Sequence, residues 1–180
     1  FMLNSAYALC GRVWCSDVCA SDLGVGSGGS IDINSASLII RDGAQIVTAI
    51  REEFDTRAAG KGDAGNVNVV VTGEIDIAGK KDEFPSGIFS GMGTSAVGNG
   101  GDIIINADSF KLKDRAEISA STFGKGNAGN VNLTAKDVSL AAANIFSTVG
   151  DGGVGAGGNI SIYAASLTLR DDAQLVTATL

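Results

Sequence analysis

The feature that most constrains this chain is an eight-residue phrase that recurs five times, first as Gly26-Ser-Gly-Gly-Ser-Ile-Asp-Ile33. The other four copies occupy residues 62–69, 98–105, 126–133 and 155–162. Successive copies begin 36, 36, 28 and 29 residues apart, a spacing too irregular for helical repeats, whose packing fixes the period. A glycine corner followed by alternating apolar residues predicts a repeated strand unit with loops of variable length.

Alignment of the five units on this phrase gives five columns of apolar residues. All 25 positions are apolar, although 44% of the chain is hydrophobic. The first strand contributes Ile31, Val67, Ile103, Val131 and Ile160, then Ile33, Val69, Ile105, Leu133 and Ile162. The second strand contributes Leu38, Ile75, Phe110, Val138 and Leu167, then Ile40, Ile77, Leu112, Leu140 and Leu169. The third strand opens with Ile46, Ile88, Ile118, Ile145 and Leu175. The positions between them are mostly polar, with Ile39 and Ile104 as exceptions, which is the period-two pattern of strands that bury one face.

The order of elements predicts how these strands stack. Each unit runs strand, corner, strand, corner, strand and Gly-rich loop, so equivalent strands of successive units can lie parallel and in register. This order predicts an all-β fold over residues 24–180, a parallel β-helix (solenoid) of about five three-strand rungs. Parallel crossovers are usually right-handed, which favours a right-handed coil. Neither end carries a cap, so we expect an uncapped fragment of a longer molecule whose terminal rungs are the weakest.

The corners repeat small polar residues. The fifth position of the phrase is Ser30, Asn66, Asp102, Asn130 and Asn159, which predicts a ladder of side chains bonded between neighbouring units rather than a ligand site. The glycines before it, such as Gly28 with Gly29 and Gly100 with Gly101, are expected to supply positive φ or close backbone approach. A second corner recurs at residues 41–44, 113–116 and 170–173, each with Asp at its second position.

Residues 1–23 do not belong to the repeat. They hold all three cysteines (Cys10, Cys15 and Cys19) and the only tryptophan, Trp14. The segment resembles translated sequencing-adapter read-through, so we predict a non-native, disordered leader that is excluded from the fold. The alternatives are a genuine unstructured leader and a metal or disulfide site. Three cysteines in a chain without histidine fall short of a four-ligand zinc set.

Charge and composition exclude several classes of function. Because residues 1–23 contain Arg12, Asp17 and Asp22, the remainder has 12 basic and 18 acidic residues. An acidic chain is a poor partner for nucleic acid or anionic lipid. No stretch approaches the roughly 18 consecutive apolar residues of a transmembrane segment. The absence of histidine excludes Ser or Cys nucleophile chemistry with a His base, and we assign no catalytic, cofactor-binding or metal-binding residue.

One acidic concentration stands out. Glu52, Glu53 and Asp55, with Asp63, lie in the long 51–66 loop among basic residues. A solvated charged loop accounts for this pattern. The alternatives are a Ca²⁺ or glycan site and a catalytic carboxylate site of the kind that polysaccharide-cleaving β-helices use.

The third strand carries two further columns. We expect Thr48, Ser90, Ala120, Ser147 and Thr177 to point inward as small core residues. An outward stripe is expected from Val47, Phe89, Ser119, Phe146 and Val176. Cover by neighbouring loops such as residues 78–87, lateral packing against another copy, and a ligand surface all remain open for the stripe.

Residues 86–90, 98–107 and 115–131 resemble the repeats of filamentous-haemagglutinin-like large exoproteins, particularly those of cyanobacteria. The resemblance extends over residues 24–180. It implies a secreted or cell-surface adhesin, exported by two-partner secretion through an outer-membrane transporter that recognises an N-terminal secretion domain. No match to that domain's Asn-Pro-Asn-Gly type motif is present, and Pro85 is the only proline.

The sequence therefore predicts a non-enzymatic repeat segment that acts as fibre stalk or adhesive surface in cell adhesion. The partners implied are the outer-membrane transporter, a carbohydrate or other cell-surface ligand, and a second fibre by lateral self-association. The expected location is the medium or the outer-membrane surface of a bacterium. The alternative is a fragment of a β-helical polysaccharide-binding or polysaccharide-cleaving protein whose site lies outside this piece.

Overall fold

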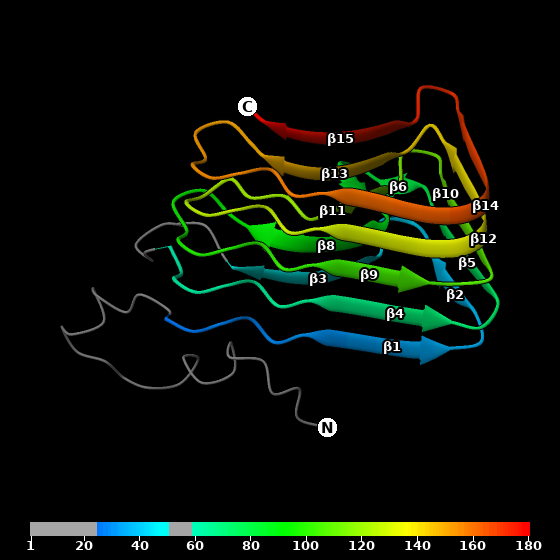
Figure 1. Cartoon of the computed structure of the whole chain (residues 1–180), viewed down its shortest axis with the longest axis horizontal. Coiled ribbons are helices and arrows are strands. Elements are labelled where there is room, and N and C mark those ends of the chain that lie inside the picture. The colour runs from blue at the N-terminus through cyan, green and yellow to red at the C-terminus, as the bar shows by residue number, and fades with distance from the viewer. Residues whose placement is uncertain (1–24, 51–58) are drawn as a thin grey trace.

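A computed structural model describes residues 25–50 and 59–180, and over these residues the protein is all-β, with no helix. Two parallel sheets and one short antiparallel pair contain all of these strands (Figure 1). The predicted all-β class and parallel pairing are confirmed for this part of the chain. The predictions for residues 1–23 and for Glu52, Glu53 and Asp55 lie outside the described residues.

The larger sheet contains the first and second strands of the five units. Its separate first strands are β1 (Ile31–Ser35), β4 (Val67–Val71) and β9 (Ile103–Asn106), and its separate second strands are β2 (Leu38–Ile40), β5 (Glu74–Ala78) and β10 (Ser109–Lys113). In the last two units both strands are continuous, as β12 (Val131–Ala141) and β14 (Ile160–Arg170). Residues 131–134 of β12 pair with β9 and residues 137–141 pair with β10, so the bend in β12 joins the two halves of the sheet at the right of Figure 1. The sequence predicted a corner in every unit, whereas here the strand runs through it.

The smaller sheet contains the third strand of every unit. In spatial order it consists of β3 (Gln45–Ile50), β8 (Gly87–Met92), β11 (Glu117–Ser119), β13 (Asn144–Val149) and β15 (Gln174–Thr179). Every pairing in it is parallel, and each strand pairs with its equivalent in the neighbouring unit.

The strand register reproduces all five predicted columns. In the first column Ile31 pairs with Val67, Val67 with Ile103, Ile103 with Val131, and Val131 with Ile160. In the last column Ile46 pairs with Ile88, Ile88 with Ile118, Ile118 with Ile145, and Ile145 with Leu175. Like side chains therefore lie on like from unit to unit, as the alternation of apolar residues predicted.

The core lies between the two sheets and is best sealed in the middle. All column residues of the second, third and fourth units are at most 1% exposed. In the last unit Leu167 is 47% exposed and Leu169 is 42% exposed, because they pack against only one neighbouring unit. The predicted inward column of small residues is also buried, at Thr48, Ser90, Ala120 and Ser147. Its hydroxyls donate to backbone carbonyls, for example Ser147 Oγ to Gly129 O at 2.7 Å.

Glycine is needed at the corners mainly because the backbones of neighbouring units approach closely, and less because of unusual φ values. A methyl group on Gly101 would overlap the carbonyl oxygen of Gly65 in the preceding unit, and Gly129 stands in the same relation to Gly101. The positive φ values lie instead at the first residue of the phrase, at +134° in Gly62 and +146° in Gly98. Both positions exclude a β-carbon because the backbone of the preceding unit lies directly against them.

The second corners are tight turns with Asp in the left-handed region. Asp42, Asp114 and Asp171 have φ of 55°, 57° and 54°. Each turn is closed by a backbone bond to the residue before Asp, as from Ala44 N to Arg41 O at 2.9 Å. Asp tolerates this conformation better than most residues, which explains its recurrence at the corner.

The second unit contains an insertion at its corner. Residues 78–87 include an antiparallel pair of β6 (Lys80–Lys81) and β7 (Phe84–Pro85). This hairpin packs on the turn of the first unit, where Gln45 Nε2 donates to Pro85 O at 3.0 Å and Gly43 N donates to Ser86 Oγ at 3.0 Å. Its residues do not line the groove beside Phe89 that is described below.

Candidate binding surface

The outward stripe on the smaller sheet forms as predicted. Val47 pairs with Phe89, Phe89 with Ser119, Ser119 with Phe146, and Phe146 with Val176. Val47 is 46% exposed, and the other four are partly buried. An apolar band of two phenylalanines and two valines therefore runs across the outside of this sheet, perpendicular to the strands.

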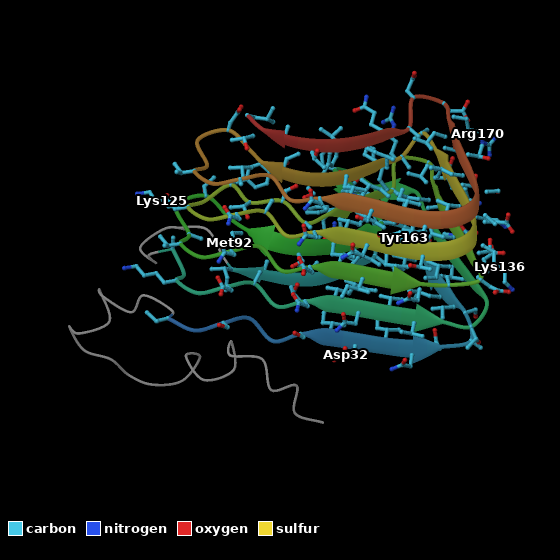
Figure 2. The ribbon with its side chains drawn as sticks, in the orientation of Figure 1. Asp32, Met92, Lys125, Lys136, Tyr163 and Arg170 are labelled. Carbon is cyan, nitrogen blue, oxygen red and sulfur yellow. The ribbon has the colours of Figure 1, made fainter. Side chains whose placement is uncertain are left out.

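A shallow groove of about 230 Å³ lies beside this stripe. Its lining residues come from β3, β8, β11 and the loops that follow β8 and β11: Ala49, Phe89, Ser90, Gly91, Met92, Gly93, Ser119, Ser121 and Phe123. Met92, which is labelled in Figure 2, is the last residue of β8 and shows where the groove lies. Phe123, which is 48% exposed, is a residue that the sequence analysis did not single out.

Glycines shape the wall that holds Phe123. Met92 bridges Thr122 and Thr122 bridges Val149, so the following residues, Gly93, Phe123 and Gly150, lie side by side in successive units. A methyl group on Gly150 would overlap the Phe123 ring. The large ring thus lies over a neighbour without a side chain, and the residue at the equivalent position on its other side, Gly93, also lacks one. This small, large, small order was visible in the sequence once the register was known.

The predicted ladder at the fifth position of the phrase is confirmed. Asp102 N donates to Asn66 Oδ1 at 2.9 Å, Asn130 N donates to Asp102 Oδ1 at 2.7 Å, and Asn159 N donates to Asn130 Oδ1 at 3.0 Å. Each side chain therefore accepts the backbone N–H of its equivalent in the next unit. The ladder is structural, because its oxygens are occupied by the chain itself.

A second ladder, which the sequence analysis missed, runs through the second position of the phrase. Asp63 Oδ1 accepts from Asn99 N at 2.7 Å and from Asn99 Nδ2 at 3.0 Å. Asn99 Oδ1 then accepts from Asn127 N at 3.0 Å, and Asn127 Oδ1 from Ala156 N at 2.9 Å. The recurrence of Asp and Asn at this position was the available signal. Asp63, which the sequence placed in a solvated charged loop with a Ca²⁺ or glycan site as an alternative, serves in this ladder.

Ion pairs connect three units on the outer face of the larger sheet. Asp76 pairs with Arg41 of the first unit, and its Oδ2 lies 3.5 Å from Lys113 Nζ of the third. Burial of Asp76 opposes its charge, but the hydrogen bond from Arg41 and the charge of Lys113 outweigh that effect, so the pKa of Asp76 is lowered. An open cavity of about 340 Å³ nearby is lined by both cations and by Asp42 and Asp114. With three carboxylates facing two cations, this cluster does not favour an anionic ligand.

Glu117 is the one carboxylate of the smaller sheet with a shifted pKa among the described residues. It lies on β11 between Gly87 and Asn144, and its burial raises its pKa. A single carboxylate of this kind does not constitute an acid and base pair.

Among residues 25–50 and 59–180 no cluster of three or more His, Cys, Asp or Glu side chains is placed to hold a metal ion. In the same residues there is no helix of the length and apolarity that crossing a membrane requires.

Comparison of the chain with protein-family models, with curated proteins and with solved structures found no match in any of the three.

Proposed function

We propose that this chain is a right-handed parallel β-helix and that it serves as a non-enzymatic repeat segment of a secreted or cell-surface exoprotein. In this proposal the segment acts as a spacer in a fibre and presents a surface for adhesion. The observation that carries it is the strand register. Equivalent strands of the five units lie parallel, and each column residue pairs with the equivalent residue of the next unit.

The coil follows from how the units connect. Each unit passes from the larger sheet to the smaller sheet and returns to the larger one beside its starting strand, a crossover between parallel strands. Such crossovers are right-handed in nearly all proteins, which supports the proposed hand. Each unit then contributes one rung, and rungs of this kind extend a chain at about 4.8 Å each.

The ladders support a spacer role. Asn and Asp side chains that bond the backbone of the next unit stabilise stacking without closing a pocket. The loops vary in length while the columns do not, so the surface can change while the frame is retained.

Export outside the cell rests on the resemblance to two-partner secretion exoproteins. A chain that folds after export benefits from the absence of cysteine in the described residues, because no disulfide has to form before or after transport. The partners in this proposal are an outer-membrane transporter and a cell-surface ligand.

The experiment fuses the full 180-residue chain behind a two-partner secretion domain and expresses it with the matching transporter in a Gram-negative host. We expect the fusion in the medium or on the cell surface, where limited proteolysis leaves a resistant fragment that begins near residue 25. The control omits the transporter and should retain the fusion in the cell. Retention with the transporter present, or complete digestion of the exported chain, would contradict the proposal.

A further inference from the structure

We propose that the groove between Phe89 and Phe123 binds a neutral polysaccharide through the apolar faces of its sugar rings. This inference deepens the proposed adhesive function and rests on it, because it assigns a ligand class to one face of the molecule. Three features carry it: the floor of the groove, its aromatic walls and its lack of charge.

The floor consists of small residues on the outer face of the smaller sheet. Ala49 pairs with Gly91, and Gly91 lies against the backbone of Ser121 in the next unit. The row of small residues therefore extends across successive units, between the column that holds Phe89 and the column that holds Phe123. A thin chain molecule can lie along this row without meeting a bulky side chain.

The walls are two phenylalanines held by glycine contacts. Phe123 lies against Gly150, and the Phe89 ring lies over Gly87, where an added β-carbon would come within 2.9 Å of Phe89 Cε2. Both rings are therefore positioned by backbone on one side and remain partly exposed on the other. Rings fixed in this way are pre-organised, which lowers the entropic cost of stacking a ligand on them.

The charge of the groove selects the class of ligand. Among the described residues no charged side chain lines it, whereas the whole chain has a net charge of −7. An anionic polymer is repelled by such a chain, and a cationic one finds no carboxylate among the described residues that line the groove. A neutral ligand matches both conditions.

A sugar chain fits this surface better than a peptide does. The backbone amides at the groove are already bonded between units, as Gly93 N is to Ile50 O at 2.9 Å and Thr122 N to Thr148 O at 2.8 Å. A peptide strand therefore finds no partner at these bonded amides, and across the sheet it would leave its own polar backbone against an apolar floor. A pyranose with equatorial hydroxyls presents C–H groups to the rings while its hydroxyls stay at the rim in water.

The spacing of the aromatic residues suits an extended chain. Phe89 and Phe146 lie on the same face two units apart, with Ser119 between them. Two steps of a parallel sheet amount to roughly 10 Å, comparable to the length of a β-linked disaccharide. A second copy of this protein is a poorer occupant, because two identical concave grooves facing each other leave a void instead of interlocking.

The test uses the full chain in affinity electrophoresis and calorimetry with three soluble neutral polysaccharides: hydroxyethyl cellulose, xyloglucan and a mixed-linkage glucan. Polygalacturonate serves as the acidic comparator. We expect binding to at least one neutral polysaccharide, no binding to polygalacturonate, and affinity about tenfold weaker in Phe89→Ser and in Phe123→Ser. Ala49→Leu fills the floor without touching the core and should weaken binding as well.

Two exposed aromatic residues provide matched controls. Phe84 lies in the hairpin and is 64% exposed, and Tyr163 lies on β14 of the larger sheet, away from Met92 in Figure 2. Phe84→Ser and Tyr163→Ser should leave affinity unchanged. Thermal unfolding of every variant checks that the fold is retained.

Three results would overturn the inference. They are failure to bind any of the three neutral polysaccharides, equal affinity in the groove variants and the controls, and a sedimentation shift showing that Phe123→Ser dissociates a dimer of the wild-type chain. The last result would assign the groove to a second copy. If the chain is exported and folded but any of these results occurs, the ligand assignment fails while the proposed function stands.

Discussion

Asp102 Oδ1 accepts two hydrogen bonds from Asn130, one from its backbone N at 2.7 Å and one from its side-chain Nδ2 at 3.0 Å. Asp63 and Asn99 repeat this relationship in the second ladder. In both cases a carboxylate is followed in the next unit by an amide, which donates to it, and not by a second carboxylate. The ladders therefore hold negative charge without placing like charges in contact.

Asn130→Asp should destabilise the fold by about 2 kcal/mol at neutral pH, because a carboxylate then faces the carboxylate of Asp102 in place of an amide donor. Urea unfolding monitored by circular dichroism measures the change. Asn132→Asp on the same strand is the control, since its register neighbours are Ile104 and Ser161. Equal stability of the two variants would show that the ladder bond contributes nothing.

Gly101→Ala should cost about 3 kcal/mol, because the added methyl group overlaps the carbonyl oxygen of Gly65. Gly29 occupies the same position of the phrase in the first unit, where an added β-carbon meets nothing within 4 Å. Gly29→Ala should therefore be nearly neutral. Chemical denaturation of both variants provides the comparison, and similar losses in the two would contradict close stacking of the units.

Leu112→Ala should destabilise the protein by about 2 to 5 kcal/mol, since Leu112 is fully buried in the third unit. Leu169 lies in the same column of the last unit but is 42% exposed, so Leu169→Ala should cost only about 1 kcal/mol. The difference in unfolding free energy tests whether the core is sealed by neighbours on both sides. A larger loss of stability in Leu169→Ala than in Leu112→Ala would contradict this explanation.

Glu117→Gln should raise stability at pH 7. Burial raises the pKa of Glu117 in the folded state, so the folded state binds its proton more tightly than the unfolded state does. The stability that this group contributes is complete below the unfolded pKa of about 4.3 and is lost as pH rises through the folded pKa. Gln removes this loss, and the difference between variant and wild type should shrink below pH 4 or so. A pH-independent difference in unfolding free energy would exclude this cause.

The columns could be predicted from the sequence because every second residue of a strand faces the core. Parallel stacking in register then places the same positions of successive units side by side. The register of Val67, Ile103 and Val131 follows directly from aligning the glycine phrase. The Asn and Asp ladder at the fifth position was predictable for a similar reason, since a small polar residue at every corner has its own copy as nearest neighbour.

Other features depend on contacts that the pattern does not encode. The bend of β12 continues as a strand where earlier units turn, and Lys136 and Asp137 reach Asp108 O through their backbone N–H groups at that bend. The groove escaped prediction because Phe123 lies outside any alternating segment, and only the neighbouring Gly93 and Gly150 reveal its place. Nothing in the local sequence distinguishes the hairpin at residues 80–85 from an open loop.

The most direct test of the stacked arrangement measures two distances by double electron–electron resonance. Cys10, Cys15 and Cys19 are first replaced by Ser, and nitroxide labels are then placed at positions 32 and 161 on the first strands, or at positions 39 and 168 on the second. In each pair the positions share one column and are separated by four steps of the parallel ladder.

In-register stacking places the α-carbons of either pair about 19 Å apart, the same in both, because four steps of about 4.8 Å separate them. The label distances should therefore form two narrow and similar distributions. Distances that differ clearly between the two pairs, or a broad distribution in either, would contradict in-register stacking and with it the proposed β-helix.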